Sequence, residues 1–196
     1  GLLARDPAQW PVLLDTVRSL PESARTLGLR LLEIDCLLAG RQGAAALEAL
    51  HRLRAGYPEE RAVAIERYRL LVEQKTAGLA AEGELGGMLR EAGLVDEAVA
   101  VMEAGLERAA AVGNTTGDDA RAERELRLML AQLYVELGRD GESKNILATV
   151  LDRPGDHQET YGFLERLSRQ GMLTRLKTLR ESIALQPGNL RARLEL

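Results

Sequence analysis

Residues 85–109 read LGGMLREAGLVDEAVAVMEAGLERA, and this stretch decides the fold. Its first half repeats apolar residues at the spacing of one helical face: Leu85, Met88, Leu89 and Ala92. Gly93 is predicted to end this helix, because glycine adopts positive φ without strain. A second apolar face follows, made of Val95, Ala98, Val99, Met102 and Leu106. Two helices joined by so short a break are predicted to fold back as an antiparallel hairpin.

Small residues lie where the two helices of this hairpin would cross. Ala98 and Gly105 both fall on the second helix. Neither carries a bulky side chain, so the two backbones are predicted to approach closely.

The same pattern of an apolar face, a glycine and a second apolar face recurs along the chain. It is found in residues 27–58, 128–151 and 161–187, with breaks at Gly40, Gly138 and Gly171 respectively. Hairpins of this size cannot bury their apolar faces alone, so they are expected to stack on one another. The sequence therefore predicts an all-α protein built as a repeat array.

The composition supports this class and argues against several others. Hydrophobic residues make up 45% of the chain, enough for a core, while the abundant Leu, Ala, Arg and Glu favour helix. A net charge of −4 argues against a nucleic-acid binder that works through phosphate contacts. No apolar run reaches the roughly 20 residues that a membrane-spanning helix needs.

The single cysteine, Cys36, excludes an intrachain disulfide and is expected to pack in a helix interior. We therefore expect a soluble protein of a reducing intracellular compartment, such as a bacterial cytosol or a plastid stroma. Since the sequence begins at Gly1, we interpret it as a fragment of a longer protein whose targeting sequence would not be visible.

The break glycines give the repeat period, since Gly138 and Gly171 lie 33 residues apart, close to the 34 of a tetratricopeptide repeat. The order of that repeat's consensus residues is matched by Leu85, Gly86, Leu89, Gly93, Ala98, Met102 and Gly105. The chain thus resembles the tetratricopeptide repeat (TPR) family, with weaker matches in the two following hairpins. The resemblance implies a right-handed α-solenoid of stacked antiparallel helix hairpins with a concave groove for a peptide.

The resemblance implies that residues 1–196 form a single repeat array, made of the following segments. Residues 1–20 are a remnant or capping helix, 22–57 a degenerate repeat, 59–77 an extra or elongated helix, 79–110 the best repeat, 119–152 and 157–187 two further repeats, and 188–196 the start of another helix. The spacing between Gly93 and Gly138 exceeds one repeat, which predicts lengthened helices around residues 109–125.

Groove positions of the family, carried over residue by residue, give a set of candidate peptide-binding residues: Gly87, Arg90, Glu91, Leu128, Gln132, Val135, Glu136, Tyr161, Glu165 and Arg169. The Lys and Asn by which some members grip a chaperone's C-terminal carboxylate are absent, which disfavours a co-chaperone. The mixed apolar and charged set implies a peptide or helix as partner.

A basic patch is the one unusual charge feature. Between Glu165 and Glu181 every charged residue is positive: Arg166, Arg169, Arg175, Lys177 and Arg180. Such a patch is either a solvated face or a docking site for an acidic segment or a lipid headgroup.

Nothing in the sequence has the pattern of a catalytic, metal or cofactor site. His51 and His157 are the only histidines, and neither has a partner at ligand spacing. No glycine-rich phosphate loop is present. We therefore expect neither an enzyme nor a bound metal or cofactor.

The leading functional hypothesis is a non-catalytic scaffold that binds a protein segment during assembly or biogenesis of a larger complex. The stretch LMLAQLYVELG (residues 128–138), after a lengthened hairpin and a polar insertion, is similar to plastid-biogenesis TPR proteins of the SLOW GREEN type. The alternatives are an RNA-binding pentatricopeptide-like protein, or a self-association domain of a larger enzyme or envelope protein. The oligomeric state is left open.

Overall fold

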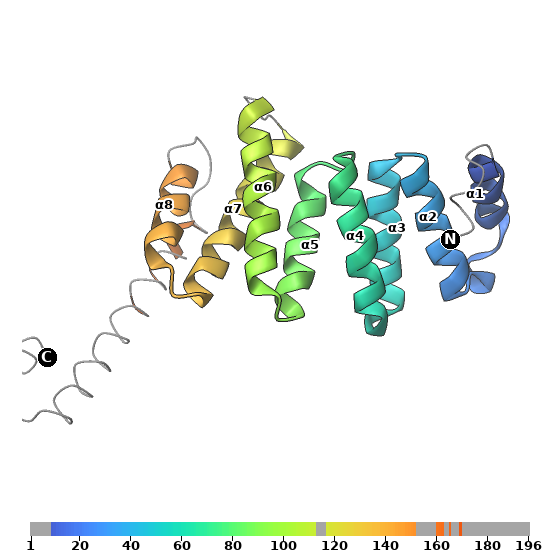
Figure 1. Cartoon of the computed structure of the whole chain (residues 1–196), viewed down its shortest axis with the longest axis horizontal. Helices are drawn as coiled ribbons and strands as arrows, with labels where there is room; N and C mark the ends of the chain where they lie inside the picture. Colours follow the sequence, from blue (N-terminus) through green and yellow to red (C-terminus); the bar gives the residue numbers. More distant parts are fainter. Residues whose placement is uncertain (1–8, 113–116, 152–159, 163–164, 166–168, 170–196) are drawn as a thin grey trace, which may run out of the picture. The chain divides into compact units, whose positions relative to one another are not determined.

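The computed structural model describes residues 9–112, 117–151, 160–162, 165 and 169. Throughout these residues the chain is helical, with turns between helices and no strand (Figure 1). The all-α prediction is confirmed, and the arrangement is that of a helical repeat-like fold. The chain forms two compact units, residues 1–133 and 134–196.

The first unit contains the helices that carry most of the observations below. They are α1 (Trp10–Ser19), α2 (Leu27–Ala39), α3 (Gly43–Gly56), α4 (Arg61–Gln74), α5 (Leu79–Glu91), α6 (Val95–Val112) and residues 118–133 of α7 (Asp118–Glu136). Short 3-10 turns at Glu22–Ala24 and Pro58–Glu60 precede α2 and α4. The second unit contains α8 (Asp140–Leu151). Helices α6 and α7, with 18 and 19 residues, show the lengthening that the glycine spacing predicts.

The turn after α5 forms as the sequence predicts. Gly93 has a φ of 79°, and the Leu94 amide donates to the Leu89 carbonyl at 2.8 Å. This hydrogen bond closes the last helical turn, while Gly93 takes the left-handed conformation that reverses the chain. Gly138 (φ 72°) does the same after α7.

Helix α2 ends at Gly40 as predicted, but the left-handed residue of the turn is the one that follows. Gly40 has a φ of −77° and ends the helix, whereas Arg41 takes the left-handed position with a φ of 53°. The Gln42 amide donates to the Leu37 carbonyl at 2.9 Å, so the same hydrogen-bonded turn forms around an arginine. Glycine is favoured at this position but is not required.

In the first unit each helix packs against the next one in the chain, from α1 through α6. The two helices of the α5–α6 hairpin approach closely, as predicted. A Cβ added to Gly105 would lie 3.1 Å from Cγ of Glu82, and Ala98 is fully buried. A Cβ added to Gly86 would lie 3.0 Å from Cγ of Met102. The small residues therefore let these two backbones approach.

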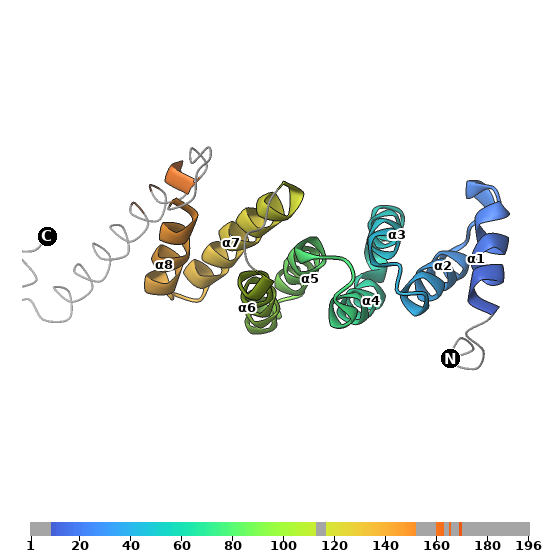
Figure 2. The same cartoon turned by 90° about the horizontal axis from the view of Figure 1, so that it is seen from above.

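Helices two apart in the chain are joined by ion pairs, which reveal two rows. In one row, Arg54 of α3 pairs with Glu84 of α5. In the other, Arg67 of α4 lies 3.2 Å from Asp35 of α2, and Arg69 of α4 lies 2.7 Å from Glu97 of α6. Figure 2 shows α3, α5 and α7 along one side and α2, α4 and α6 along the other.

Helix α4 lies between α3 and α5 in the chain, and its presence places α3 and α5 in the same row. The sequence division makes residues 27–39 the first helix of a repeat, like residues 79–91. Because α4 intervenes, α3 rather than α2 has the direct ion pair with α5. The groove beside α5 is therefore continued by α3.

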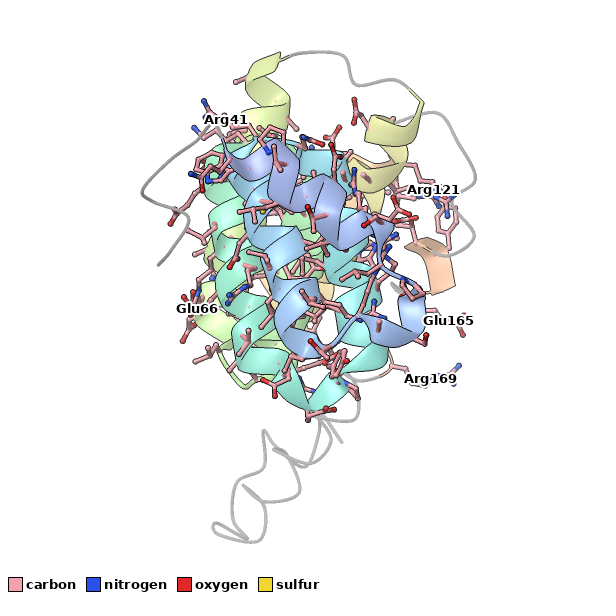
Figure 3. All side chains as sticks on the ribbon, turned by 90° about the vertical axis from the view of Figure 1, so that its right-hand side faces the viewer. Arg41, Glu66, Arg121, Glu165 and Arg169 are labelled. Atoms are coloured by element: carbon pink, nitrogen blue, oxygen red, sulfur yellow. The ribbon has the colours of Figure 1, made fainter. Side chains whose placement is uncertain are left out.

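The interior between the rows is aliphatic, and Cys36 is part of it as predicted. Leu37, Leu50, Leu71 and Leu89 are fully buried. Burial raises the pKa of the Cys36 thiol. Charged residues such as Arg41 and Glu66 lie on the outside of the helices (Figure 3). Among the described helices, none combines the length and the apolar content needed to cross a bilayer.

Candidate functional site

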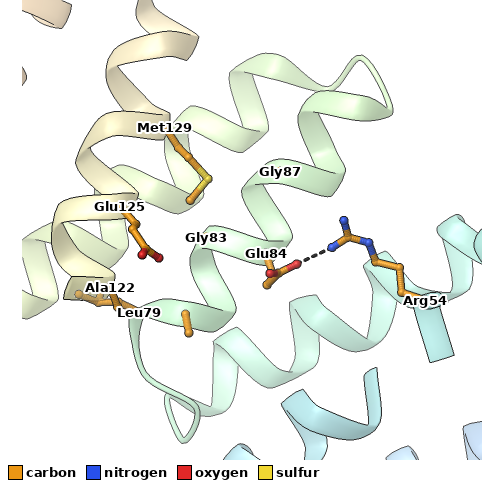
Figure 4. Close-up of a pocket in the computed structure, with 9 residues that line it drawn as sticks. Arg54, Leu79, Gly83, Glu84, Gly87, Ala122, Glu125 and Met129 are labelled. Carbon is orange, nitrogen blue, oxygen red and sulfur yellow. Dashed lines mark hydrogen bonds and ion pairs between the residues drawn. The ribbon is translucent and has the colours of Figure 1, made fainter. Parts of the chain in front are cut away.

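A pocket of about 270 Å³ opens on the row formed by α3, α5 and α7 (Figure 4). We call it the groove pocket. Its lining residues are Arg54, Leu79, Ala80, Gly83, Glu84, Gly87, Ala122, Glu125 and Met129.

The floor of the groove pocket is made of small residues of α5. Ala80, Gly83 and Gly87 fall at i, i+3 and i+7, so they share one face of the helix. A Cβ added to Gly87 would meet no atom within 4 Å, whereas one added to Gly83 would lie 3.0 Å from Cε of Met129. The floor is therefore covered at Gly83 and open at Gly87.

Helix α7 forms one wall with Ala122, Glu125 and Met129, which also share a helical face. Figure 4 shows the side chains of Glu125 and Met129 reaching from α7 toward Gly83 of α5. This wall offers a thioether and a methyl group beside one carboxylate.

The opposite wall carries a charged pair. Arg54 of α3 donates a hydrogen bond to Glu84 of α5, and Nε2 of His51 lies 3.6 Å from Oε1 of Glu84. An adjoining hollow of about 300 Å³ is lined by His51, Arg54, Ala55 and Glu84. Since the two hollows share Arg54 and Glu84, the groove surface continues from α5 onto α3.

Among the described residues, Glu125 is held by an exposed contact. Nε of Arg121 donates to Oε1 of Glu125 at 2.9 Å, and the side chains are 80% and 57% exposed. An exposed pair of this kind contributes about 0.3–0.5 kcal/mol within a helix. The carboxylate can therefore exchange Arg121 for a donor of a bound partner at little cost.

Tyr68 of α4 lies behind the Arg54–Glu84 pair and is fully buried. Burial raises the pKa of its hydroxyl, and the charge of Glu84 raises it further. Among the described residues the hydroxyl makes no hydrogen bond of good geometry, and the nearby Arg54 guanidinium offsets only part of the rise in pKa. A buried phenol with a raised pKa stays protonated, so it is not a general base.

The predicted groove residues of the first unit fall in several places. Gly87 lines the groove pocket. Arg90 and Glu91 are exposed at the end of α5, and Oε2 of Glu91 lies 3.4 Å from Arg61 of α4, toward the other row. Leu128 and Gln132 are half-buried on α7, outside the set that lines the pocket.

The predicted groove residues of the second unit are mostly exposed. Val135 is half-buried, Glu136 is exposed and Tyr161 is 60% exposed. Glu165 and Arg169 are both exposed and pair with each other at 2.9 Å.

Arg169 is also the only member of the predicted basic patch within the described residues. The other four lie outside them: Arg166, Arg175, Lys177 and Arg180. The prediction of a docking site there stays a prediction.

Of the residues that line the groove pocket, only Gly87 is in the predicted set, so Arg54, Ala122 and Met129 are among those that the sequence analysis missed. Arg54 was missed because groove positions were transferred only from the first helix of each repeat. Ala122 and Met129 are separated by seven residues, and this helical spacing on α7 could have been read from the sequence. Met129 directly follows Leu128, which was predicted.

In the described part of the chain no group of three or more His, Cys, Asp and Glu side chains could hold a metal ion. No family model matches the chain, and comparisons with curated proteins and with solved structures yield no match. The site must therefore be interpreted from its own geometry.

Proposed function

We propose that this chain is a TPR-like protein-interaction module, a right-handed α-solenoid of stacked hairpins without catalytic activity. It holds a segment of a partner protein in the groove formed by α3, α5 and α7, and serves as a scaffold in assembly of a larger complex. The observation that carries this proposal is the groove pocket, which is open above Gly87 and lined by both apolar and charged groups.

The size of the pocket favours a peptide over a free small molecule. Pockets for small molecules measure roughly 300–1,000 Å³ and enclose most of their ligand. The groove pocket, at about 270 Å³, falls below this range. It suits an apolar side chain of a longer segment whose remainder lies on the neighbouring surface.

The chemistry of the lining also suits a peptide. Leu79 and Met129 provide apolar contact for a side chain. The charged groups of Arg54, Glu84 and Glu125 surround that contact and can hydrogen-bond to peptide amides and polar side chains. A few polar groups around an apolar centre are typical of surfaces that bind protein segments.

The test is a substitution that fills the pocket and leaves the protein folded. Gly87→Leu places a side chain in the open space above the α5 floor, and replacing a mid-helix glycine does not weaken the helix. Random peptides displayed on phage are selected on the wild-type chain, and the enriched peptides are measured by fluorescence anisotropy. We expect Gly87→Leu to lower their affinity at least about tenfold, the effect of losing one buried contact at the centre of an interface.

The matched control is Gly28→Leu. Gly28 lies in α2, and an added Cβ there would also meet no atom within 4 Å. This variant should bind the peptides as the wild type does, and urea titration should show both variants folded. Equal binding by Gly87→Leu and wild type would contradict the proposal, as would a selection that enriches no peptide.

A further inference from the structure

A cluster of arginines surrounds a buried carboxylate at the junction of α1, α2 and α3. The side chain of Glu33 is only 5% exposed. Nε of Arg18 and Nη2 of Arg52 each lie 3.5 Å from its Oε1, and Nη1 of Arg25 lies 3.8 Å from its Oε2. The two guanidinium groups of Arg18 and Arg52 therefore lie close together, one from α1 and one from α3.

These contacts leave hydrogen-bonding capacity on the guanidinium groups. Charge-assisted hydrogen bonds in proteins measure about 2.7–2.9 Å, so contacts of 3.5 Å and 3.8 Å are loose. Arg18 and Arg52 are each 44% exposed. Each guanidinium has five N–H donors, and a single shared oxygen cannot use them all.

Arg25 is the fixed member of the cluster. It is 15% exposed, and it donates to the carbonyls of Leu20 at 3.2 Å and of Arg18 at 2.9 Å. Its guanidinium adds positive charge next to the half-exposed guanidinium groups of Arg18 and Arg52.

Other carboxylates near the cluster are solvent-exposed. Glu22 lies 3.4 Å from Arg25 but makes its shorter contact, 2.6 Å, with Arg30. Glu48 lies 3.5 Å from Arg52 and is 73% exposed. Exposed pairs like these are weak and exchange readily with a competing anion.

The sign of the charges changes along the helices that border the groove. The arginine cluster lies where α1 and α3 meet α2, and the Arg54–Glu84 pair follows between α3 and α5. The groove pocket between α5 and α7 carries the weakly held Glu125. An extended segment laid along these helices would meet positive charge first, then a neutral pair, then an apolar pocket with a carboxylate.

We propose that the arginine cluster formed by Arg18, Arg25 and Arg52 binds an acidic side chain of the segment whose apolar side chain fills the groove pocket. This inference rests on the proposed function and adds to it the charge of the partner and the spacing between its acidic and apolar residues. Directly packed helices lie about 8–10 Å apart, so two helix spacings place the two sites at least about 20 Å apart. An extended chain advances about 3.3 Å per residue, so the acidic and apolar residues lie at least about six positions apart.

The first test is the sequence of the selected peptides. Peptides enriched on the wild-type chain should carry Asp or Glu at least about six residues from a large apolar residue. They are then synthesised with an amidated C-terminus, so that only a side chain can supply the carboxylate. Replacing that Asp or Glu by Asn or Gln should weaken binding about tenfold, as expected for a lost charge-assisted hydrogen bond.

The second test uses variants of the cluster. Arg52→Gln and Arg18→Gln should each weaken binding of the acidic peptide about tenfold, yet leave binding of its amide-substituted form unchanged. The matched control is Arg41→Gln, at an exposed arginine of the α2–α3 turn, which should change neither. Because each single variant leaves Glu33 with two of its three arginines, the fold should persist, and circular dichroism checks it.

A third variant separates a docking site from a structural cluster. Glu33→Gln removes the internal carboxylate that competes for the guanidinium donors. If the cluster receives the partner, this variant binds the acidic peptide several-fold more tightly, the opposite sign to the arginine variants. If the arginines serve only to neutralise Glu33, the affinity is unchanged.

The outcomes separate this inference from the proposed function. Peptides that lose binding to Gly87→Leu but carry no acidic residue, and bind Arg52→Gln normally, would overturn the arginine site and keep the groove. A selection without any enriched peptide would overturn both.

Discussion

Gly86 and Gly87 are adjacent on α5, yet they face different surroundings. A Cβ on Gly86 would press against Met102 of α6, whereas one on Gly87 would meet nothing. Helix α7 shows the same contrast between its ion pairs. Glu123 and Arg127 are 2% and 14% exposed, while Arg121 and Glu125 are 80% and 57% exposed.

The contrast separates residues that are packed inside the fold from residues that lie exposed on its surface. A glycine inside a helix costs about 0.5–1 kcal/mol relative to alanine. At Gly86 close packing against α6 offsets that cost. At Gly87 no contact offsets it, which is why this open face is the better candidate for binding.

The largest expected effect comes from the ion pairs of α7. Arg127→Ala removes the group that donates to Glu123 at 2.6 Å and leaves a buried carboxylate with weaker compensation. We expect the free energy of unfolding to fall by about 3 kcal/mol, measured by urea titration. The exposed counterpart, Arg121→Ala, should change it by less than about 0.5 kcal/mol. Equal losses of stability in the two variants would contradict the difference between the buried and the exposed ion pair of α7.

The next effect concerns Gly43, the first residue of α3. An added Cβ would overlap the backbone carbonyl of Thr76, which cannot turn aside as a side chain can. Gly43→Ala should therefore lower the free energy of unfolding by about 2–3 kcal/mol. Gly56→Ala, at the other end of the same helix with open space around it, serves as the control and should cost nothing. A stable Gly43→Ala variant would mean that the α4–α5 connection is looser than the structure shows.

The adjacent glycines of α5 test the contrast directly. Gly86→Ala should destabilise the protein by about 1 kcal/mol, because Met102 must shift and the gain in helix propensity offsets only part of that cost. Gly87→Ala should instead stabilise it by about 0.5–1 kcal/mol. Urea midpoints that move in opposite directions would sharpen the comparison, whereas shifts of the same sign would break it.

The smallest effect concerns the buried hydroxyl of Tyr68. Its raised pKa means that the unfolded state ionises first as pH rises, so stability is full below about pH 10, the ordinary tyrosine value, and falls above it. Tyr68→Phe should leave stability at pH 7 within about 1 kcal/mol of wild type, because the hydroxyl it removes has at most a weak contact with Arg54. It should also reduce the alkaline loss, measured by urea titration from neutral to alkaline pH.

The control for that measurement is Tyr161→Phe, at a side chain that is 60% exposed. An alkaline loss unchanged by Tyr68→Phe would show that other groups cause it.

Local features of the fold were predictable from the sequence where neighbours in the chain determine them. The hairpin of residues 79–110, its turn at Gly93 and its close approach at Gly105 follow from apolar spacing and from glycine itself. The break at Gly40 was predicted, but the left-handed residue of that turn is Arg41, in a conformation that glycine favours without being required for it. Gly43 was overlooked because its neighbour, Thr76, is distant in the chain.

The candidate site was only partly predictable. Gly87 was found through the family resemblance, since it belongs to the best-matching repeat. Arg54 and the cluster around Glu33 were not found, because their partners come from different helices.

By itself, the sequence determined that this chain is helical, where most of its helices turn, and that α5 and α6 approach closely. These properties depend on residues within a few turns of one another. Only the tertiary structure decided that α3 lies beside α5, that Gly86 is covered while Gly87 is open, and that three arginines meet at Glu33. Those properties depend on which helix faces which, and the inserted α4 helix sets that arrangement through contacts between distant segments.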